Sequence, residues 1–137
     1  MDPNDLPHGV TPSPVASRIG VTLTEISAER TVGSVPVEPN LQPWGVLHGG
    51  VSAFLAEELA SIAASMHAGP DGTAVGVDLN ATHHRAARSG VVTGVATAIH
   101  LGRSVASYQV EITDDEQRRL CTARLTCFLK RPAVPSS

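Results

Sequence analysis

Two adjacent carboxylates, Glu57 and Glu58, lie within a stretch that otherwise consists mainly of small and apolar residues. A carboxylate held away from water has a raised pKa, which suits it to act as a general base or as a nucleophile. On a helix, Ser61 lies one turn beyond Glu57, where its hydroxyl could contact that carboxylate or a water molecule. Residue types alone do not show which glutamate is buried, and both could instead reach solvent at the helix edge.

The motif His48-Gly49-Gly50 precedes these carboxylates. Glycines in the first turn of a helix leave backbone N–H groups accessible, and the helix dipole adds partial positive charge there. Such donors can polarise a carbonyl group as an oxyanion hole does, although a Gly-Gly pair also occurs in plain turns. Gly49 and Glu57 are about 12 Å apart along one helix, so one carbonyl cannot contact both. If both serve one site, we expect them to come from antiparallel helices of two subunits.

The elements that position these residues can be predicted from the sequence pattern. Residues 49–67 are rich in alanine, lack proline and are followed by Gly69-Pro70, which predicts one long helix. Alternating apolar residues predict two strands before this helix and four after it, at residues 19–28, 30–37, 74–82, 90–101, 103–113 and 118–130. Short turns between the later strands favour an α+β fold with an antiparallel sheet against the helix.

The predicted helix carries small residues on one face, at Ala53, Ala56, Ala60 and Ala64. Its large apolar residues form a second face, and a helix that is apolar on two faces is usually buried on both. We therefore expect a second subunit to cover the small-residue face, which predicts a homodimer or a larger assembly.

Length and composition limit the protein class. A chain of 137 residues suits one domain, which we place at residues 15–137 after a flexible arm at residues 1–14. A net charge of -3 argues against nucleic-acid binding. The sequence contains neither an apolar run long enough to span a membrane nor a signal peptide pattern, so we expect a cytoplasmic protein. Cys121 and Cys127 share one face of a predicted strand and are expected to be free core thiols.

The segment from Gln42 to Ser61, QPWGVLHGGVSAFLAEELAS, resembles hot-dog-fold acyl-CoA thioesterases of the branch that contains 4-hydroxybenzoyl-CoA thioesterase and the phenylacetate-pathway thioesterase. The resemblance extends over residues 19–132. It implies a hot-dog fold, in which an antiparallel sheet wraps around one long central helix. It also implies hydrolysis of a small aryl- or medium-chain acyl-CoA without a further cofactor, in a homotetramer whose dimers build the active sites.

The resemblance assigns roles by position. Glu57, rather than the next residue, would be the catalytic carboxylate, acting as nucleophile or as general base on water. The Gly49 N–H would polarise the thioester carbonyl with help from the Gln42 side chain. Ser61 would position the hydrolytic water, and His48 would brace the loop rather than transfer protons.

Candidate CoA contacts follow from two further segments. The run NATHHRAARSG resembles the family's segment before a glycine turn, which makes Arg85 a candidate phosphate ligand. The run LGRS resembles the family's Gly-Arg-Ser/Thr turn, so Arg103 and Ser104 are candidate contacts to the nucleotide.

This chain departs from the family pattern at two histidines. His83 and His84 stand where the family has a bulky apolar pair, so its acyl-pocket contacts cannot be carried over at these positions. Two histidines can also suggest a metal site. Adjacent strand residues face opposite ways, however, and no third ligand is evident, so we expect no metal.

Three other functions remain open from the sequence. A non-catalytic acyl-CoA-binding protein of the same fold would not need a carboxylate facing the acyl group. An acyl-CoA hydratase or dehydratase pairs histidine with a carboxylate at other spacings, and Ile62 occupies the position fourteen residues after His48. The last alternative is a structural homodimer.

Overall fold

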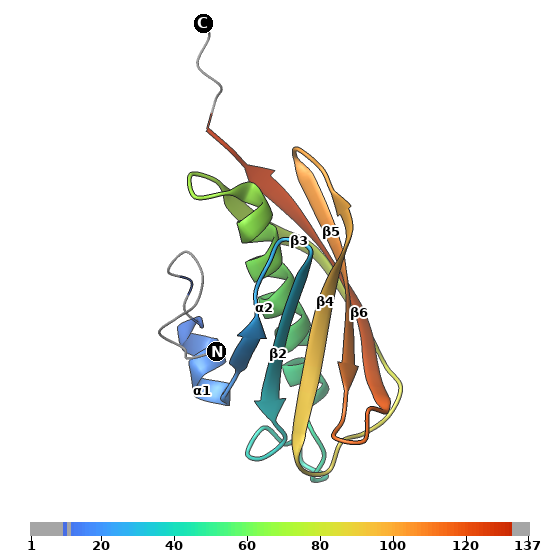
Figure 1. The fold of residues 1–137 in the computed structure, drawn as a ribbon. Helices are drawn as coiled ribbons and strands as arrows, with labels where there is room; N and C mark the ends of the chain where they lie inside the picture. The colour runs from blue at the N-terminus through green and yellow to red at the C-terminus, as the bar shows by residue number, and fades with distance from the viewer. Residues whose placement is uncertain (1–9, 11, 133–137) are drawn as a thin grey trace, which may run out of the picture.

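The computed structural model describes residue 10 and residues 12–132, and it shows one antiparallel sheet curved around a long helix, α2 (Figure 1). The elements in chain order are α1 (Pro14–Ile19), β1 (Thr22–Glu25), β2 (Arg30–Pro36), α2 (Gly49–Ala68), β3 (Thr73–His83), β4 (Val91–Leu101), β5 (Val105–Thr113) and β6 (Arg119–Lys130). This arrangement confirms the α+β fold and the predicted order of two strands, one long helix and four strands.

The six strands lie in the order β1-β2-β4-β5-β6-β3, and every neighbouring pair is antiparallel. β4, β5 and β6 follow one another directly, whereas β3, which leaves the end of α2, pairs with the last strand. β3 therefore forms one edge of the sheet, with no strand of the described chain on its outer side.

A short helix, α1, replaces the beginning of the first predicted strand. Ser13 caps this helix, because its side chain accepts a hydrogen bond from the backbone of Ala16, and Pro14 occupies the first turn. Gly20 ends it with a left-handed φ of 86°, and β1 begins two residues later. The prediction of strand structure at residues 19–21 was therefore wrong. Of the predicted arm at residues 1–14, residues 1–9 and 11 lie outside the described part of the chain.

Close packing of α2 on the sheet depends on two glycines in neighbouring strands. Gly33 of β2 pairs with Gly94 of β4, and both lie beneath Leu59 of the helix. A Cβ placed on either glycine would lie 2.7 Å from a methyl carbon of Leu59. The missing side chains therefore let the helix approach the sheet and bury Leu59 completely.

The small-residue face of α2 does not need a second subunit to cover it. Ala56, Ala60 and Ala64 are fully buried within the single chain. The argument for a dimer from this face was therefore wrong for these three residues. The half-buried positions of the helix instead include Glu57 and Ser61.

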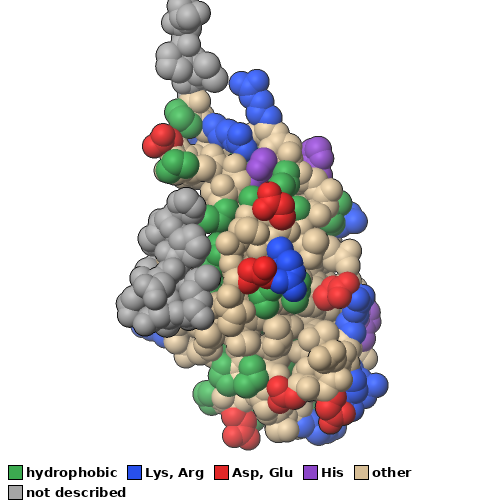
Figure 2. All heavy atoms as spheres, viewed as in Figure 1, with side chains coloured by type: hydrophobic (Ala, Val, Ile, Leu, Met, Phe, Trp, Pro, Cys, Tyr) green, Lys and Arg blue, Asp and Glu red, His purple; other side chains and the backbone are tan. Residues whose placement is uncertain are grey.

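Cys121 and Cys127 are both buried and unpaired, which confirms the expectation of free core thiols. The face of the molecule in Figure 2 carries charged side chains of both signs, dispersed rather than gathered into one patch. Within the described residues, no helix combines the length and the hydropathy needed to cross a membrane.

Candidate active site

The first turn of α2 presents one unused backbone donor. His48 is the N-cap, and its Nδ1 accepts the Gly50 N–H at 2.8 Å. Among the hydrogen bonds of residues 10 and 12–132, none uses the Gly49 N–H. His48 thus occupies one donor and fixes the turn, which agrees with a bracing role, and the Gly49 donor remains available to a ligand.

Gln42 lies in a tight loop just before the helix. The loop is closed by a bridge between Leu41 and Leu47, and the Gln42 N–H donates to the Val46 carbonyl at 2.9 Å. The backbone N–H of Trp44 donates a hydrogen bond to the Gln42 side-chain oxygen. Because this contact occupies the amide oxygen, the side-chain NH₂ group of Gln42 is left as a donor. Trp44 itself is 82% exposed.

Gln42 and Gly49 line the same cavity, which has a volume of about 340 Å³ and also borders Leu47, Ser52 and Arg85. The two groups that the sequence predicts to polarise a carbonyl therefore lie at one cavity. A third polar group, the imidazole of His83, lines this cavity as well. A Cβ placed on Gly49 would lie 3.2 Å from both Cε1 and Nε2 of His83.

The two adjacent histidines have different surroundings. His83 ends β3 beside the first turn of α2. The Nε2 of His84 instead lies 2.9 Å from the hydroxyl of Thr122. Both histidines nevertheless line the same cavity, so the expectation that their side chains face opposite ways stays a prediction. No cluster of three or more His, Cys, Asp or Glu side chains that could hold a metal ion occurs within the described residues.

Glu57 lies farther along α2 and does not line the cavity of Gln42 and Gly49. Its carboxylate rests over Gly76 of β3, where an added Cβ would be 3.2 Å from Oε1. Gly76 pairs with Cys127 of β6. Burial raises the pKa of the Cys127 thiol to about 11; the negative charge of Glu57 adds to this rise, and a hydrogen bond from Ser61 opposes it. Glu57, Ser61 and Cys127 therefore meet between the helix and the edge of the sheet.

Glu58 has a different contact. Its Oε1 accepts the backbone N–H of Ser13 at 3.2 Å, which ties α1 to α2. Glu58 is thus bonded to the residue that caps α1, whereas the carboxylate of Glu57 lies between α2 and β3.

Arg85 lies between the cavity and a second hollow of about 340 Å³, lined by both basic and acidic side chains. Arg118, at its border, is paired with Asp114 at 2.8 Å. Arg85 and Arg88 form no salt bridge with any described residue. Arg88, which borders this hollow, was not singled out in the sequence, because one exposed loop arginine cannot be told from another by residue type alone.

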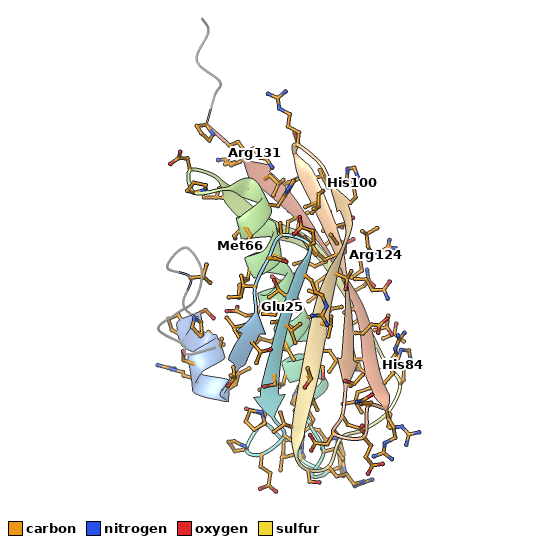
Figure 3. All side chains as sticks on the ribbon, viewed as in Figure 1. Glu25, Met66, His84, His100, Arg124 and Arg131 are labelled. Carbon is orange, nitrogen blue, oxygen red and sulfur yellow. The ribbon has the colours of Figure 1, made fainter. Side chains whose placement is uncertain are left out.

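Arg103 and Ser104 lie far from Arg85 within one chain. Arg103 borders a hollow of about 510 Å³ beside the last residues of α2, together with Arg131. The Ser104 carbonyl accepts the Leu129 N–H at 2.9 Å. In Figure 3, Arg131 lies near the upper end of the molecule and His84 lies in its lower half. A single chain therefore does not bring the predicted CoA contacts together.

Comparison with known proteins gives a consistent result. The family model described as thioesterase superfamily matches residues 45–121. A candidate esterase of Vibrio cholerae is 43% identical over 114 residues, which cover 82% of this chain and 76% of that protein. The 1,4-dihydroxy-2-naphthoyl-CoA hydrolase of Listeria monocytogenes is 38% identical over 114 residues, covering 82% of this chain and 93% of the hydrolase.

The fold is also similar to solved structures. A thioesterase from Haemophilus influenzae superposes with a TM-score of 0.82 at 39% identity, covering 85% of this chain and 82% of that one. A thioesterase from Pseudomonas aeruginosa, solved with one glutamine replaced by alanine, has a TM-score of 0.79 at 37% identity and covers 85% of each chain.

Proposed function

Because the chain belongs to the thioesterase superfamily and is a thioester hydrolase, we propose that it cleaves a small aryl- or medium-chain acyl-CoA to the free acid and CoA. One observation carries the proposal. The unused Gly49 N–H and the free amide donor of Gln42 line one cavity, so both are available to the oxygen of a single thioester carbonyl.

The chemistry needs a carboxylate in addition to these donors. As the carbonyl oxygen gains negative charge, the Gly49 N–H and the Gln42 NH₂ group stabilise it. Glu57 then either attacks the carbonyl carbon or removes a proton from a water that attacks it. Ser61, which lies near Glu57, positions that water. Both routes require ionised Glu57.

We infer that this carboxylate comes from a partner subunit. Gly49 and Glu57 are about 12 Å apart along α2, too far for both to contact one carbonyl group. The edge strand β3 offers a surface for the partner, because Val75 is 56% exposed and Val77 is 48% exposed. An edge strand with exposed apolar residues is a template for pairing with another strand. A homodimer through antiparallel β3 strands covers this edge.

The contacts of β3 suggest the register of that pairing. His83 lies beside Gly49, and Gly76 lies beneath Glu57. Their pairing partners in β6, Cys121 and Cys127, are both buried, so both positions face the helix layer. Residues directly opposite in an antiparallel pair share a face. Pairing His83 with Gly76 of the partner subunit therefore brings the Gly49 end of one helix to Glu57 of the other.

The same dimer accounts for the separated arginines. From Glu57 to the end of α2 the helix extends by about 16 Å. When Glu57 of the partner subunit lies beside Gly49, the end of the partner's helix extends past Gly49 towards Arg85 and Arg88. Arg103 of the partner subunit then approaches Arg85, and CoA phosphates are held by both subunits.

A thiol-release assay tests the function. The panel contains aryl-CoA thioesters, including 1,4-dihydroxy-2-naphthoyl-CoA, and medium-chain acyl-CoAs. We expect release of free CoA by the native protein and its near-complete loss in Glu57→Ala with folding retained. Glu58→Ala is the matched control, because it loses only the contact to Ser13.

Other outcomes identify the alternatives. Binding of acyl-CoA without thiol release indicates a non-catalytic acyl-CoA-binding protein. Addition of water to an enoyl-CoA indicates a hydratase. Full activity of Glu57→Ala contradicts the assigned role of this carboxylate.

A further inference from the structure

We propose that His83 is a catalytic residue that donates a hydrogen bond to the sulfur of the thiol leaving group. This inference rests on the proposed thioesterase function and adds a group that the sequence resemblance did not assign. Hydrolysis places negative charge first on the carbonyl oxygen and then on the sulfur. Gly49 and Gln42 donate to the oxygen, and His83 would donate to the sulfur.

The position of His83 supports this role. Its ring contacts the glycine that carries the free N–H, with Cε1 and Nε2 each 3.2 Å from the position of a Gly49 Cβ. A side chain at Gly49 would therefore compete with the imidazole for the same space. No hydrogen bond within the described residues uses a ring nitrogen of His83, whereas the rings of His48 and His84 are both engaged. Its ring donor is therefore available to a ligand.

The lining of the cavity indicates which side of the thioester His83 contacts. Gln42 and Gly49, the donors proposed for the carbonyl oxygen, line the cavity together with His83 and Arg85. Arg85 lies two residues after His83 in the chain and also borders the second hollow with Arg88. If these arginines bind the phosphates of CoA, the pantetheine arm passes His83 on its way to the carbonyl. The sulfur, rather than the acyl group, is then next to the imidazole.

The step balances without any additional reactant. Water adds its oxygen to the carbonyl carbon, and the proton it loses goes to Glu57 of the partner subunit and then to solvent. The carbon–sulfur bond breaks with its electron pair on sulfur. The His83 ring N–H donates a hydrogen bond to this thiolate, which takes a proton from solvent after it leaves. A donor placed at a forming anion accelerates such a step.

The test varies the basicity of the leaving thiol. Two thioesters share one acyl group and lack the nucleotide: the N-acetylcysteamine thioester, with a basic alkyl thiolate, and the 4-nitrothiophenyl thioester, with a weakly basic one. We expect His83→Ala to lower kcat for the first by about 10-fold to 100-fold, because a hydrogen bond to a charged group is lost. For the second we expect a loss of less than about 3-fold, because that thiolate needs little stabilisation.

Two further variants complete the design. His83→Gln keeps a side-chain N–H donor and should recover part of the loss on the alkyl thioester. His84→Ala removes the neighbouring ring, which lines the same cavity but has its Nε2 2.9 Å from the Thr122 hydroxyl; any loss it causes should be equal on the two substrates. Thermal melting of each variant confirms folding before kinetics are compared.

Failure of this inference is distinguishable from failure of the proposed function. Equal losses on both thioesters, or no loss on either, would overturn the role of His83 while leaving the thioesterase activity standing. A native protein that hydrolyses no thioester of either panel overturns the function, and the role of His83 with it.

Discussion

A mixing experiment between two inactive variants tests whether each active site uses two subunits. Glu57→Ala removes the carboxylate, and Gln42→Ala removes a carbonyl donor at the other end of the site. Because Gly49 and Glu57 are about 12 Å apart along one helix, we expect these two halves to come from different chains. A dimer with one copy of each variant then has one site with both residues intact and one site with both missing.

The size of the recovery follows from the two-fold symmetry. Random association at equal concentrations makes half of the dimers mixed, and each mixed dimer has one intact site of two, so activity should reach about one quarter of the native value. Refolding the variants together and measuring thiol release is the assay. Mixing Glu57→Ala with the Gln42→Ala/Glu57→Ala double variant is the control and should give no recovery. Activity no higher than the mean of the two parents would refute the shared site.

Further predictions concern stability and reactivity. Gly94→Ala places a Cβ 2.7 Å from Leu59 Cδ1, so the free energy of unfolding measured with urea should fall by about 1–3 kcal/mol. Leu59→Ala should lower the free energy of unfolding by less in the Gly94→Ala variant than in the native protein. If the two losses of unfolding free energy simply add, Gly94 and Leu59 do not pack as described. Tyr108→Phe removes the donor of a 2.6 Å hydrogen bond to Ala28 and should lower the unfolding free energy by about 1–3 kcal/mol in urea titrations. Burial raises the pKa of Tyr108, so the native protein should lose stability as pH rises above about 10, the unfolded value, and the variant should lose less. The buried thiol of Cys127, with its pKa of about 11, should not react with a maleimide at neutral pH in the folded protein but should react in urea. Mass spectrometry measures the labelling. Rapid labelling of the folded protein would be inconsistent with this burial.

The sequence predicted the elements well where periodicity is strong. The helix at 49–67 and the strand at 118–130 each lie within one residue of the observed bounds at either end. The short helix α1 was missed because its six residues are too few to show a helical period, although Ser13 and Pro14 are a known start signal. Local pattern therefore predicted long elements better than short ones.

The site was predicted in part. Gln42 and Gly49 were expected to act together and do line one cavity. The proximity of His83 to Gly49 could not be predicted, because it depends on how far β3 extends before it passes the first turn of α2. The distance between Arg85 and Arg103 within one chain likewise depends on strand topology rather than on any local motif.

Trp44 gives the protein a tryptophan fluorescence signal that comes from one residue. It is the only tryptophan of the chain, it is 82% exposed, and its backbone N–H donates a hydrogen bond to the side-chain oxygen of Gln42. The emission of a solvent-exposed indole shifts when water around it is displaced. The intrinsic fluorescence of this protein therefore reports on the loop that carries Gln42, and a non-hydrolysable acyl-CoA analogue can be titrated against it without any attached dye.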